Sequence, residues 1–345
     1  MAEVLINSKN YYNNLDWIAS HIGSKEKIAL VLKDNAYGHG LSEIAKLAKN
    51  YGIKSVFVKN EREAMEIKDL FPHITMFYGR FLYEKLDYLP SNIHPTIHSK
   101  KHLANIPPKT AIELKVNIGM NRNGIEPEEL ESVIDAILHQ KLELFGVFTH
   151  DGYSDENTMD FHNLQKLFCH IKEEVKQIAK KKGFLPPRFH SLNSAGALRD
   201  QNVEEIARIG IAAYGYAPLN FPLAITQKLK PVLSLWADRI CTHHLKKGDR
   251  IGYGGVSQLD QDSIVSTYDI GYGDGFFRLD GSKEEYFSAE GFKILPRTSM
   301  DCFSALSNQD KICVFNDATA LAKIFHTIPY EILTSISPFI KRRVI

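Results

Sequence analysis

Cysteine is scarce in this chain of 345 residues, and its four cysteines are scattered along it. Cys169, Cys241, Cys302 and Cys313 show no CxxC or CxxxC spacing, which argues against both a zinc site and a disulfide framework. An excess of charge is also missing, because 42 lysines and arginines face 41 aspartates and glutamates. Without a basic excess, nucleic acid is a poor candidate partner.

Long hydrophobic runs are absent too. No stretch reaches the ~18 apolar residues of a membrane-spanning helix, and residues 1–17 lack the basic and apolar regions of a signal peptide. We therefore expect a cytoplasmic protein that does not bind a membrane. The length permits a large core and two domains, since single cores stop growing near ~250–300 residues.

Hydrophobic periodicity alternates between strand and helix patterns over the first two thirds of the chain. Apolar runs predict strands at 28–32, 55–58, 74–78, 112–116, 144–150 and 188–192. Amphipathic patterns predict helices at 41–48, 61–70, 127–138 and 163–183, the last ending at Gly183. Because such alternation is typical of a parallel sheet covered by helices, we expect an α/β fold. An N-terminal (β/α)8 TIM-type barrel is the architecture that we expect, although periodicity alone does not count its strands.

The pattern changes near residues 217–231. Beyond them, short strands with turn residues between them are predicted at 233–245, 263–272, 292–296 and 311–315, with little helix. We expect a barrel domain at 1–228 and a mostly β C-terminal domain at 229–345, with membership of the second domain as the alternative for the first few residues.

The sequence VLKDNAYGHG (31–40) places a lysine, Lys33, where a buried strand ends and a small flexible loop begins. In a barrel, residues just past the carboxyl ends of the strands line the face that holds the active site. That rule draws Lys33, Lys115 or Arg122, His150, Asn193 with Ser194, and 208–211 to one mouth. Taken singly, these residues have non-catalytic explanations. Lys33 could be a surface lysine, His150 a histidine at the rim of the barrel, and Asn193 with Ser194 a helix N-cap.

The ordered motifs of the chain resemble those of the alanine racemase family, fold-type III enzymes that use pyridoxal 5′-phosphate. The resemblance covers nearly the whole length. It rests on VLKDNAYGHG (31–40), ELKVNIGMNRNGI (113–125), GVFTHDGYSDE (146–156), SLNSAG (191–196), RIGIAAYGYAP (208–218), GYGG (252–255), DIGYGDGF (269–276), SMDC (299–302) and TIPYEIL (327–333).

The resemblance implies a two-base racemisation of alanine. Lys33 matches the family lysine that carries the cofactor and acts as the base for the D-antipode. Tyr253 matches the base for the L-antipode, which the partner subunit supplies in the family, so a homodimer with shared sites is expected. D-Alanine for peptidoglycan is the product that the family implies.

The resemblance also assigns residues that hold the cofactor. Its binding set is Lys33, Tyr37, His150, Asn193, Ser194, Arg208, Gly210, Ile211 and Tyr330. Arg208 is expected to face the pyridine nitrogen and leave it unprotonated, because a guanidinium keeps its proton. His150 is expected to link the catalytic tyrosine to Arg208.

The remaining roles concern the substrate. Arg122 is expected to bind the substrate carboxylate and the cofactor phenolate, assisted by the backbone of Met300 of the partner subunit. Tyr272 is expected to narrow the entrance. Asp301 is expected to position the turn that carries Met300. Lys115 matches a lysine often carbamylated in the family, and Asn117 stands where the family usually has aspartate.

Two alternatives stay open. One is another fold-type III enzyme, such as a serine or broad-specificity racemase or an amino-acid decarboxylase, which would keep Lys33 and the phosphate site. The other is a non-catalytic pyridoxal phosphate carrier, which would lack the second domain and Tyr253. No metal is expected.

Overall fold

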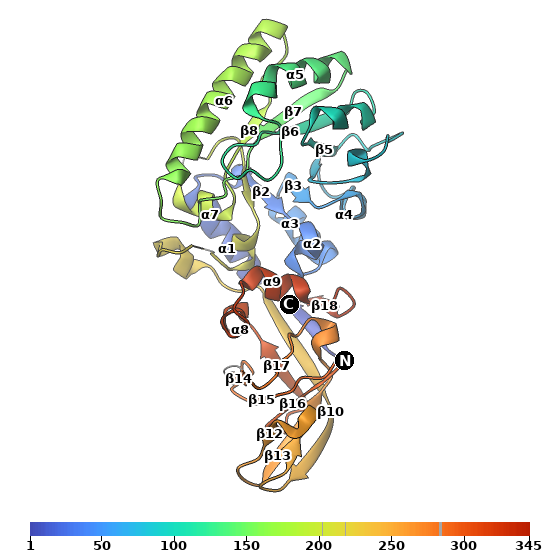
Figure 1. The fold of residues 1–345 in the computed structure, drawn as a ribbon, viewed down its shortest axis with the longest axis vertical. Helices are drawn as coiled ribbons and strands as arrows, with labels where there is room; N and C mark the ends of the chain where they lie inside the picture. Colours follow the sequence, from blue (N-terminus) through green and yellow to red (C-terminus); the bar gives the residue numbers. More distant parts are fainter. Residues whose placement is uncertain (202, 218, 283–284) are drawn as a thin grey trace. The chain divides into compact units, whose positions relative to one another are not determined.

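A computed structural model describes residues 1–201, 203–217, 219–282 and 285–345 (Figure 1). Pro218, the last residue of the motif at 208–218, lies outside them. The chain forms two compact units: a barrel unit made of 12–34 and 44–230, and a β unit made of 1–11, 35–43 and 231–345. The part of the chain that the structure describes contains no helix long and apolar enough to cross a membrane.

The barrel unit contains eight parallel strands in the order β8-β7-β6-β5-β4-β3-β2-β9, which confirms the expected TIM-type barrel (Figure 1). They are β2 (Ile28–Val31), β3 (Ser55–Val58), β4 (His73–Met76), β5 (Ile93–Ile97), β6 (Ala111–Lys115), β7 (Glu143–Phe148), β8 (Arg188–His190) and β9 (Ala207–Ile209). The strands at β5 and β9 were not predicted from periodicity.

The barrel is nearly closed, and the seam lies between β8 and β9 at the two ends of the strand order. There the Arg208 amide donates to the Leu192 carbonyl at 3.0 Å. Two carboxylates accept other amides of this edge: Glu205 from Phe189 at 2.9 Å and Glu204 from Ser191 at 2.7 Å. These side chains therefore accept hydrogen bonds from backbone amides that direct pairing between β8 and β9 would otherwise have satisfied.

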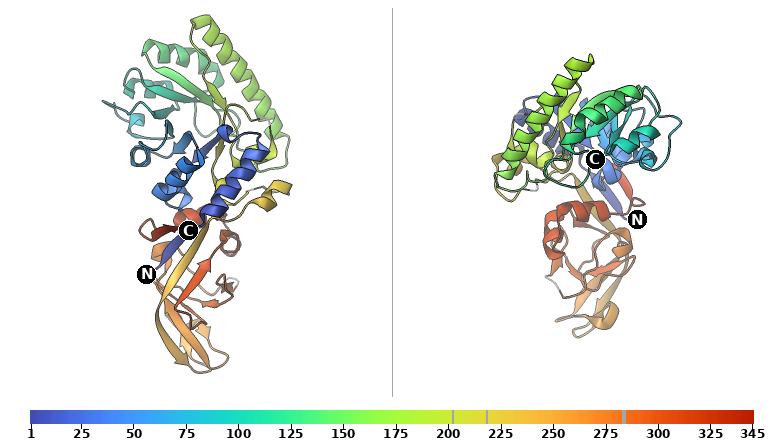
Figure 2. Two further views of the ribbon diagram at one scale, coloured as in Figure 1. Left: turned by 180° about the vertical axis from the view of Figure 1, so that it is seen from behind. Right: turned by 45° about the horizontal axis from the view of Figure 1, so that its top comes forward.

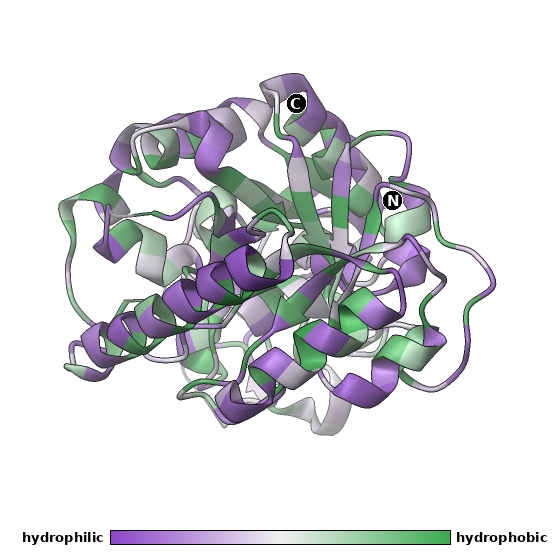
Figure 3. Cartoon of the chain, turned by 90° about the horizontal axis from the view of Figure 1, so that it is seen from above, coloured by the Kyte–Doolittle hydropathy of each residue, from purple (hydrophilic) through white to green (hydrophobic). Residues whose placement is uncertain are grey.

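Helices cover the outside of the barrel strands, as both views of Figure 2 show for α6. The helices before the β-rich part are α1 (Ser8–His21), α2 (Lys33–Tyr37), α3 (Leu41–Tyr51), α4 (Glu61–Glu66), α5 (Leu130–His139), α6 (Asp160–Lys182) and α7 (Ser194–Arg199). Helix α6 buries one apolar stripe, including Phe161, Phe168 and Val175, and its hydrophilic residues face outward (Figure 3). Gly183 ends α6 with φ 75°, as predicted.

Short 3₁₀ helices join several elements. They lie at Lys25–Lys27, Arg80–Leu82, Lys100–Asn105, Pro127–Glu129, Ile211–Tyr214 (η5), Ala224–Lys228, Tyr253–Gly255 (η7) and Tyr272–Asp274 (η8).

The β unit is mostly β, as expected. Its main sheet runs β14-β15-β16-β13-β10-β1-β18, and β17 pairs with β10. These strands are β1 (Glu3–Ile6), β10 (Leu233–Leu245), β13 (Ser263–Tyr268), β14 (Tyr286–Phe287), β15 (Lys293–Leu295), β16 (Phe303–Ala305), β17 (Lys311–Phe315) and β18 (Lys341–Val344). A small second sheet pairs β11 (Arg250–Ile251) with β12 (Ser257–Gln258).

The two ends of the chain meet in this sheet, because β1 pairs antiparallel with β10 and parallel with β18. Strand β10 matches the prediction at 233–245. Two helices that periodicity did not predict, α8 (Ala318–Ile324) and α9 (Pro329–Ser335), also belong to the β unit. Apolar side chains of Ile251, Leu259, Val265 and Leu295 form a small buried core.

Candidate active site

Five cationic or titratable side chains gather where the barrel strands end. Lys33 follows β2, Lys115 ends β6, His150 follows β7 and Arg208 lies in β9, while Arg122 lies on the loop after β6. Burial lowers the pKa of His150 well below its usual value, and the charges of Arg208, Arg122, Lys115 and Lys33 add to the effect in that order. The structure therefore brings these five predicted residues together.

Lys33 is half-buried at the carboxyl end of β2. Burial lowers its pKa; the Asp34 carboxylate opposes this and the Arg122 guanidinium adds to it. Asp34 is itself engaged by Lys59, whose Nζ lies 2.6 Å from an Asp34 oxygen. The lysine amine is thus easier to deprotonate than a free lysine.

The short element α2 that begins at Lys33 is a single turn of left-handed conformation, where the sequence predicted a loop. Asp34, Asn35, Ala36 and Tyr37 have φ of 55°, 56°, 51° and 54°. Such a conformation costs L-residues roughly 1–2 kcal/mol each, so it persists only where other contacts hold it. One is the hydrogen bond of 2.8 Å from the Leu41 amide to the Asn35 side-chain oxygen.

Gly38 follows this turn with φ 80°, and the space around it admits no side chain. A Cβ at this position would lie 1.9 Å from the carbonyl oxygen of Leu333. The Gly38 carbonyl also accepts a hydrogen bond of 2.9 Å from Arg342. Glycine in the motif at 31–40 is therefore required by both backbone conformation and close packing.

Lys115 is 6% exposed, and its ammonium donates a hydrogen bond to the side-chain oxygen of Asn123. Burial lowers the Lys115 pKa to about 7, with further lowering from the charges of Arg122 and Arg208. An amide satisfies the donor but brings no negative charge. The cluster around Lys115 therefore keeps an excess of positive charge.

Asn117 has a local explanation. Its side-chain amide donates to a carboxylate oxygen of Glu126 at 3.0 Å. An aspartate at this position would place two carboxylates together, which costs free energy. An asparagine at 117 can therefore donate a hydrogen bond to Glu126 without adding a second negative charge.

Arg208 is buried, 3% exposed, and its terminal nitrogens make four hydrogen bonds. Nη1 donates to His190 Nδ1 at 2.6 Å and to the His190 carbonyl at 3.2 Å; Nη2 donates to the carbonyls of Thr149 at 2.7 Å and Ser191 at 3.0 Å. Burial lowers the Arg208 pKa to about 10. Four bonds match the four hydrogens of the two Nη atoms. Among the residues that the structure describes, no bond from Nε is seen, so Nε–H is a candidate donor to a ligand.

Ser194 gathers backbone amides. Its hydroxyl oxygen accepts from Gly210 N at 2.9 Å and from Ala212 N at 3.3 Å, while Ile211 begins η5 between them. Asn193 is the N-cap of α7, with its side-chain oxygen accepting from the Gly196 amide at 2.9 Å. Asn193 therefore shapes the turn that presents Ser194.

In the β unit, two predicted tyrosines lie together. The rings of Tyr37 and Tyr330 have centroids 5.8 Å apart and are tilted by 47°. Tyr37 is buried, and Tyr330 lies in the first turn of α9.

The β unit also brings Tyr272 and Met300 together. The Tyr272 amide donates to the Ser299 carbonyl at 3.0 Å, and the Gly273 amide to the Met300 carbonyl at 2.7 Å. Asp301 follows in a turn that Ser299 and Cys302 close with a backbone bond of 2.9 Å. Tyr253 begins η7 after Gly252, whose φ is 72°. Within the single chain, Tyr253 is 66% exposed, Met300 62% and Tyr272 42%.

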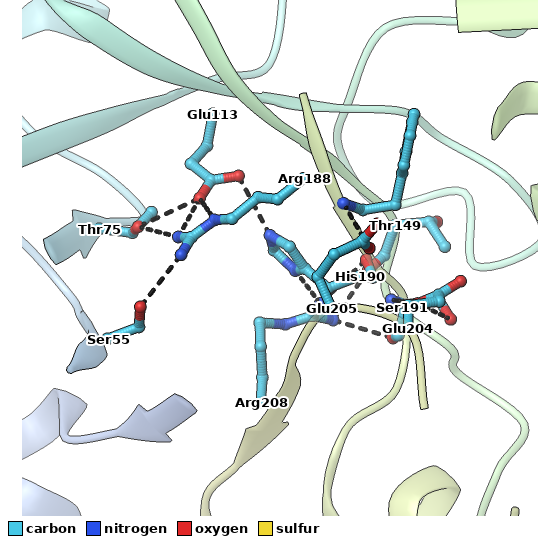
Figure 4. Close-up of polar contacts among 11 residues, drawn as sticks. Ser55, Thr75, Glu113, Thr149, Arg188, His190, Ser191, Glu204, Glu205 and Arg208 are labelled. Carbon is cyan, nitrogen blue, oxygen red and sulfur yellow. Dashed lines mark hydrogen bonds and ion pairs between the residues drawn. The ribbon is translucent and has the colours of Figure 1, made fainter. Parts of the chain in front are cut away.

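Sequence reasoning missed several buried polar residues next to this cluster (Figure 4). Glu113 accepts from Arg188 Nε at 2.9 Å and pairs with His190 Nε2 at 3.0 Å, and it is His190 that contacts Arg208. The available signal was a charged or polar residue at alternate positions inside otherwise apolar strands, as in IELK and RFH.

Comparisons with known proteins agree over the whole chain. The sequence model of the N-terminal domain of alanine racemase matches residues 6–218, and that of its C-terminal domain matches 232–344. An alanine racemase of Campylobacter concisus is 40% identical over 351 residues, covering 100% of both chains. One from Nitratiruptor is 38% identical over 342 residues, covering 99% of each.

Solved structures share the fold. An alanine racemase of Clostridium difficile superposes with a TM-score of 0.87 at 24% identity, covering 100% of this chain and 95% of the other. An alanine racemase of Bacillus anthracis with bound L-Ala-P gives a TM-score of 0.81 at 27% identity, with the same coverage. From the two matched domains and the full-length relatives, this chain belongs to the alanine racemase family of isomerases.

Proposed function

We propose that this protein interconverts L- and D-alanine with pyridoxal 5′-phosphate, using Lys33 and Tyr253 as bases. The observation that carries the proposal is the convergence of Lys33, Lys115, Arg122, His150 and Arg208 at the barrel mouth. Such a concentration of positive charge suits a substrate carboxylate and a cofactor phosphate together.

The donors present fit the cofactor. Backbone amides of Gly210 and Ala212 already converge on one oxygen acceptor, the Ser194 hydroxyl, and a phosphate oxygen is an acceptor of the same kind. Ser194, Gly210, Ile211 and the hydroxyls of Tyr37 and Tyr330 would hold the phosphate, and Asn193 would support Ser194. When bound through Lys33, pyridoxal phosphate supplies the electron sink that makes removal of the α-proton accessible.

Two bases account for inversion. One side chain removes the α-proton on one face and the other returns a proton to the opposite face. Lys33 serves the D-antipode and Tyr253 the L-antipode. The lowered pKa of Lys33 supports its part, because a base must lose its own proton near neutral pH.

Arg208 would hold the pyridine ring of the cofactor through its Nε–H. Because a guanidinium keeps its proton, such a partner would give a weaker electron sink than a carboxylate would, which suits return of the α-proton rather than decarboxylation or transfer of the amino group. His150 lies in the same charged cluster, but the expected link from His150 to Arg208 is replaced here, because the imidazole that accepts a hydrogen bond from Arg208 is that of His190.

Arg122 and the Met300 backbone hold the substrate carboxylate, with Asp301 supporting the Met300 turn and Tyr272 narrowing the entrance. Lys115 is carbamylated. Its pKa near 7 supports this, because only the unprotonated amine reacts with CO₂. The nitrogen forms a bond to carbon and releases a proton, and the resulting carbamate anion offsets the charge of Arg122.

The active form is a homodimer with shared sites. The large exposed fractions of Tyr253 and Met300, 66% and 62% in the single chain, support a partner subunit that covers them. We assign residues 1–228 to the cofactor-binding barrel domain, apart from 1–11 and 35–43, which belong to the β unit, and we assign 229–345 to the β-rich domain. The matched ranges 6–218 and 232–344 support this division. The enzyme acts in the cytoplasm and supplies D-alanine for peptidoglycan.

Proton NMR of L-alanine in D₂O, with purified protein, added pyridoxal phosphate and a chiral readout, tests the activity. We expect loss of the α-proton signal together with the appearance of D-alanine. Lys33→Ala should abolish both, whereas Lys59→Gln, which removes a neighbouring ammonium, should retain them. Cofactor binding without exchange of alanine contradicts the proposal, and exchange of serine alone would assign another member of fold-type III.

A further inference from the structure

A buried chain of hydrogen bonds crosses the barrel from Glu113 through His190 to Arg208 (Figure 4). His190 Nε2 lies 3.0 Å from a Glu113 oxygen, and His190 Nδ1 lies 2.6 Å from Arg208 Nη1. Glu113 and His190 are both 0% exposed. The imidazole also stacks on Phe148, with ring centroids 4.8 Å apart and an angle of 12°.

The donors and acceptors of this chain permit one arrangement of protons. Arginine has only donors, so His190 Nδ1 must be the acceptor of the bond from Nη1. A neutral imidazole then carries its hydrogen on Nε2, which donates to the Glu113 carboxylate. A second proton on Nδ1 would face the Arg208 donor directly.

Glu113 is held as a carboxylate. Burial by itself would raise its pKa, but the Arg188 guanidinium and the hydrogen bond from His190 outweigh burial and keep the pKa well below its usual value. Arg188 donates to Glu113 through Nε at 2.9 Å and through Nη2, and its guanidinium lies 4.3 Å from the Phe145 ring centroid. Neither oxygen of Glu113 therefore carries a proton, so Glu113 cannot donate to His190 and can only accept from it.

We propose that Glu113 and His190 are positioning residues for Arg208: the Glu113 carboxylate fixes His190 in the Nε2–H tautomer, whose Nδ1 lone pair then holds the Arg208 guanidinium in place. The consequence for racemisation rests on the proposed function, because Arg208 must present Nε–H to the cofactor. The tautomer itself belongs to the protein alone. It is therefore open to measurement without cofactor.

The variant Glu113→Gln distinguishes two hypotheses: that Glu113 sets the tautomer of His190, or that it only forms a structural ion pair with Arg188. The Oε1 atom of Glu113 accepts from Arg188 and from Thr75 at 3.4 Å, and Oε2 accepts from His190. A carboxylate can accept hydrogen bonds from Arg188 and from His190 at the same time, whereas the side-chain amide of glutamine has one acceptor oxygen and one donor NH₂ group. If the glutamine oxygen stays with Arg188, its NH₂ faces His190 and displaces the Nε2–H tautomer.

The experiment uses the full chain without added cofactor, labelled with ¹⁵N-histidine, and reads the His190 tautomer by two-dimensional NMR at neutral pH. His190→Gln identifies the resonances. We expect the Nε2–H form in the wild type and in the matched control Thr75→Val, which alters only the Arg188 side of Glu113. Glu113→Gln should make that form the minor one.

A wild-type His190 that is Nδ1–H or doubly protonated at neutral pH overturns the proposal, and this result needs no variant to fold. A folded Glu113→Gln protein that retains the Nε2–H form also overturns it. In the holoenzyme, Glu113→Gln should lower kcat about ten- to hundredfold, the effect of losing a hydrogen bond to a charged group, with a smaller change in KM for alanine. If the wild type does not racemise alanine, the proposed function fails while the tautomer result stands.

Discussion

Lys115 donates its ammonium hydrogen to the side-chain oxygen of Asn123, and Asn123 in turn donates to the Tyr78 hydroxyl at 3.4 Å. The Asn123 amide thus joins Lys115, at the end of β6, to Tyr78, which follows β4. Because Asn123 has no charge, it leaves the repulsion from Arg122 and Arg208 uncompensated. The Lys115 ammonium therefore has a hydrogen-bond acceptor but no negative charge to offset its own.

This charge imbalance predicts carbamylation that depends on CO₂. Incubation with ¹³C-bicarbonate should give one carbamate carbon signal in the wild type and none in Lys115→Met. Removing CO₂ should lower racemase activity reversibly. A wild-type spectrum identical to that of Lys115→Met would contradict the assignment.

The Lys115 pKa also predicts how stability depends on pH in CO₂-free buffer. It is lowered to about 7 in the folded chain, whereas an unfolded lysine titrates near ~10.4. Between these values the unfolded state binds more protons, so the free energy of unfolding rises with pH, by up to about 1.4 kcal/mol per pH unit.

Urea unfolding at pH 7 and pH 9 measures this effect. The wild type should gain stability relative to Lys115→Met, which lacks the titrating group but keeps much of its apolar stem. An equal change in both proteins would show that Lys115 does not titrate in this range.

Tyr253→Phe should separate the two directions of the reaction. Without the hydroxyl, abstraction from L-alanine should fall about 10²–10⁴-fold, whereas exchange of the D-alanine α-proton with solvent should persist through Lys33. Deuterium incorporation from each enantiomer in D₂O measures this. Tyr83→Phe, at a tyrosine that is 88% exposed in the barrel unit, is the matched control. Equal loss in both directions refutes the assignment of one base to each face.

Arg208→Lys should affect both stability and reaction course. A lysine has three donors where Arg208 makes four bonds through Nη alone. The free energy of unfolding should fall by about 1.5–3 kcal/mol, measured by urea unfolding.

The same variant should release more pyruvate per racemisation event, because an ammonium shares its proton with the ring nitrogen more readily than a guanidinium does. A coupled assay for pyruvate, run beside the chiral assay, measures the ratio. An unchanged ratio in a folded variant would exclude electronic tuning by Arg208.

Local sequence patterns predicted a parallel domain of alternating strands and helices and the approximate position of its site, but they did not count the strands of the barrel. The alternation of apolar strands with amphipathic helices predicts parallel strands, and the carboxyl ends of such strands meet at one face. Lys33, Lys115 and His150 could therefore be placed at a common mouth from their positions alone. Strand β5 escaped prediction because it contains Pro95, which argues against a strand inside a sheet, and β9 spans only Ala207–Ile209.

Only the tertiary structure decided how these residues are held. The bond between His190 and Glu113 joins positions 77 residues apart, and the one between Arg208 and Thr149 joins positions 59 apart. No local pattern encodes such pairs, because burial and charge at each position depend on the elements that pack around it. The left-handed turn after Lys33 is a further example: its sequence has no strong turn signal of its own at Ala36 and Tyr37, and contacts made elsewhere in the fold keep it in that conformation.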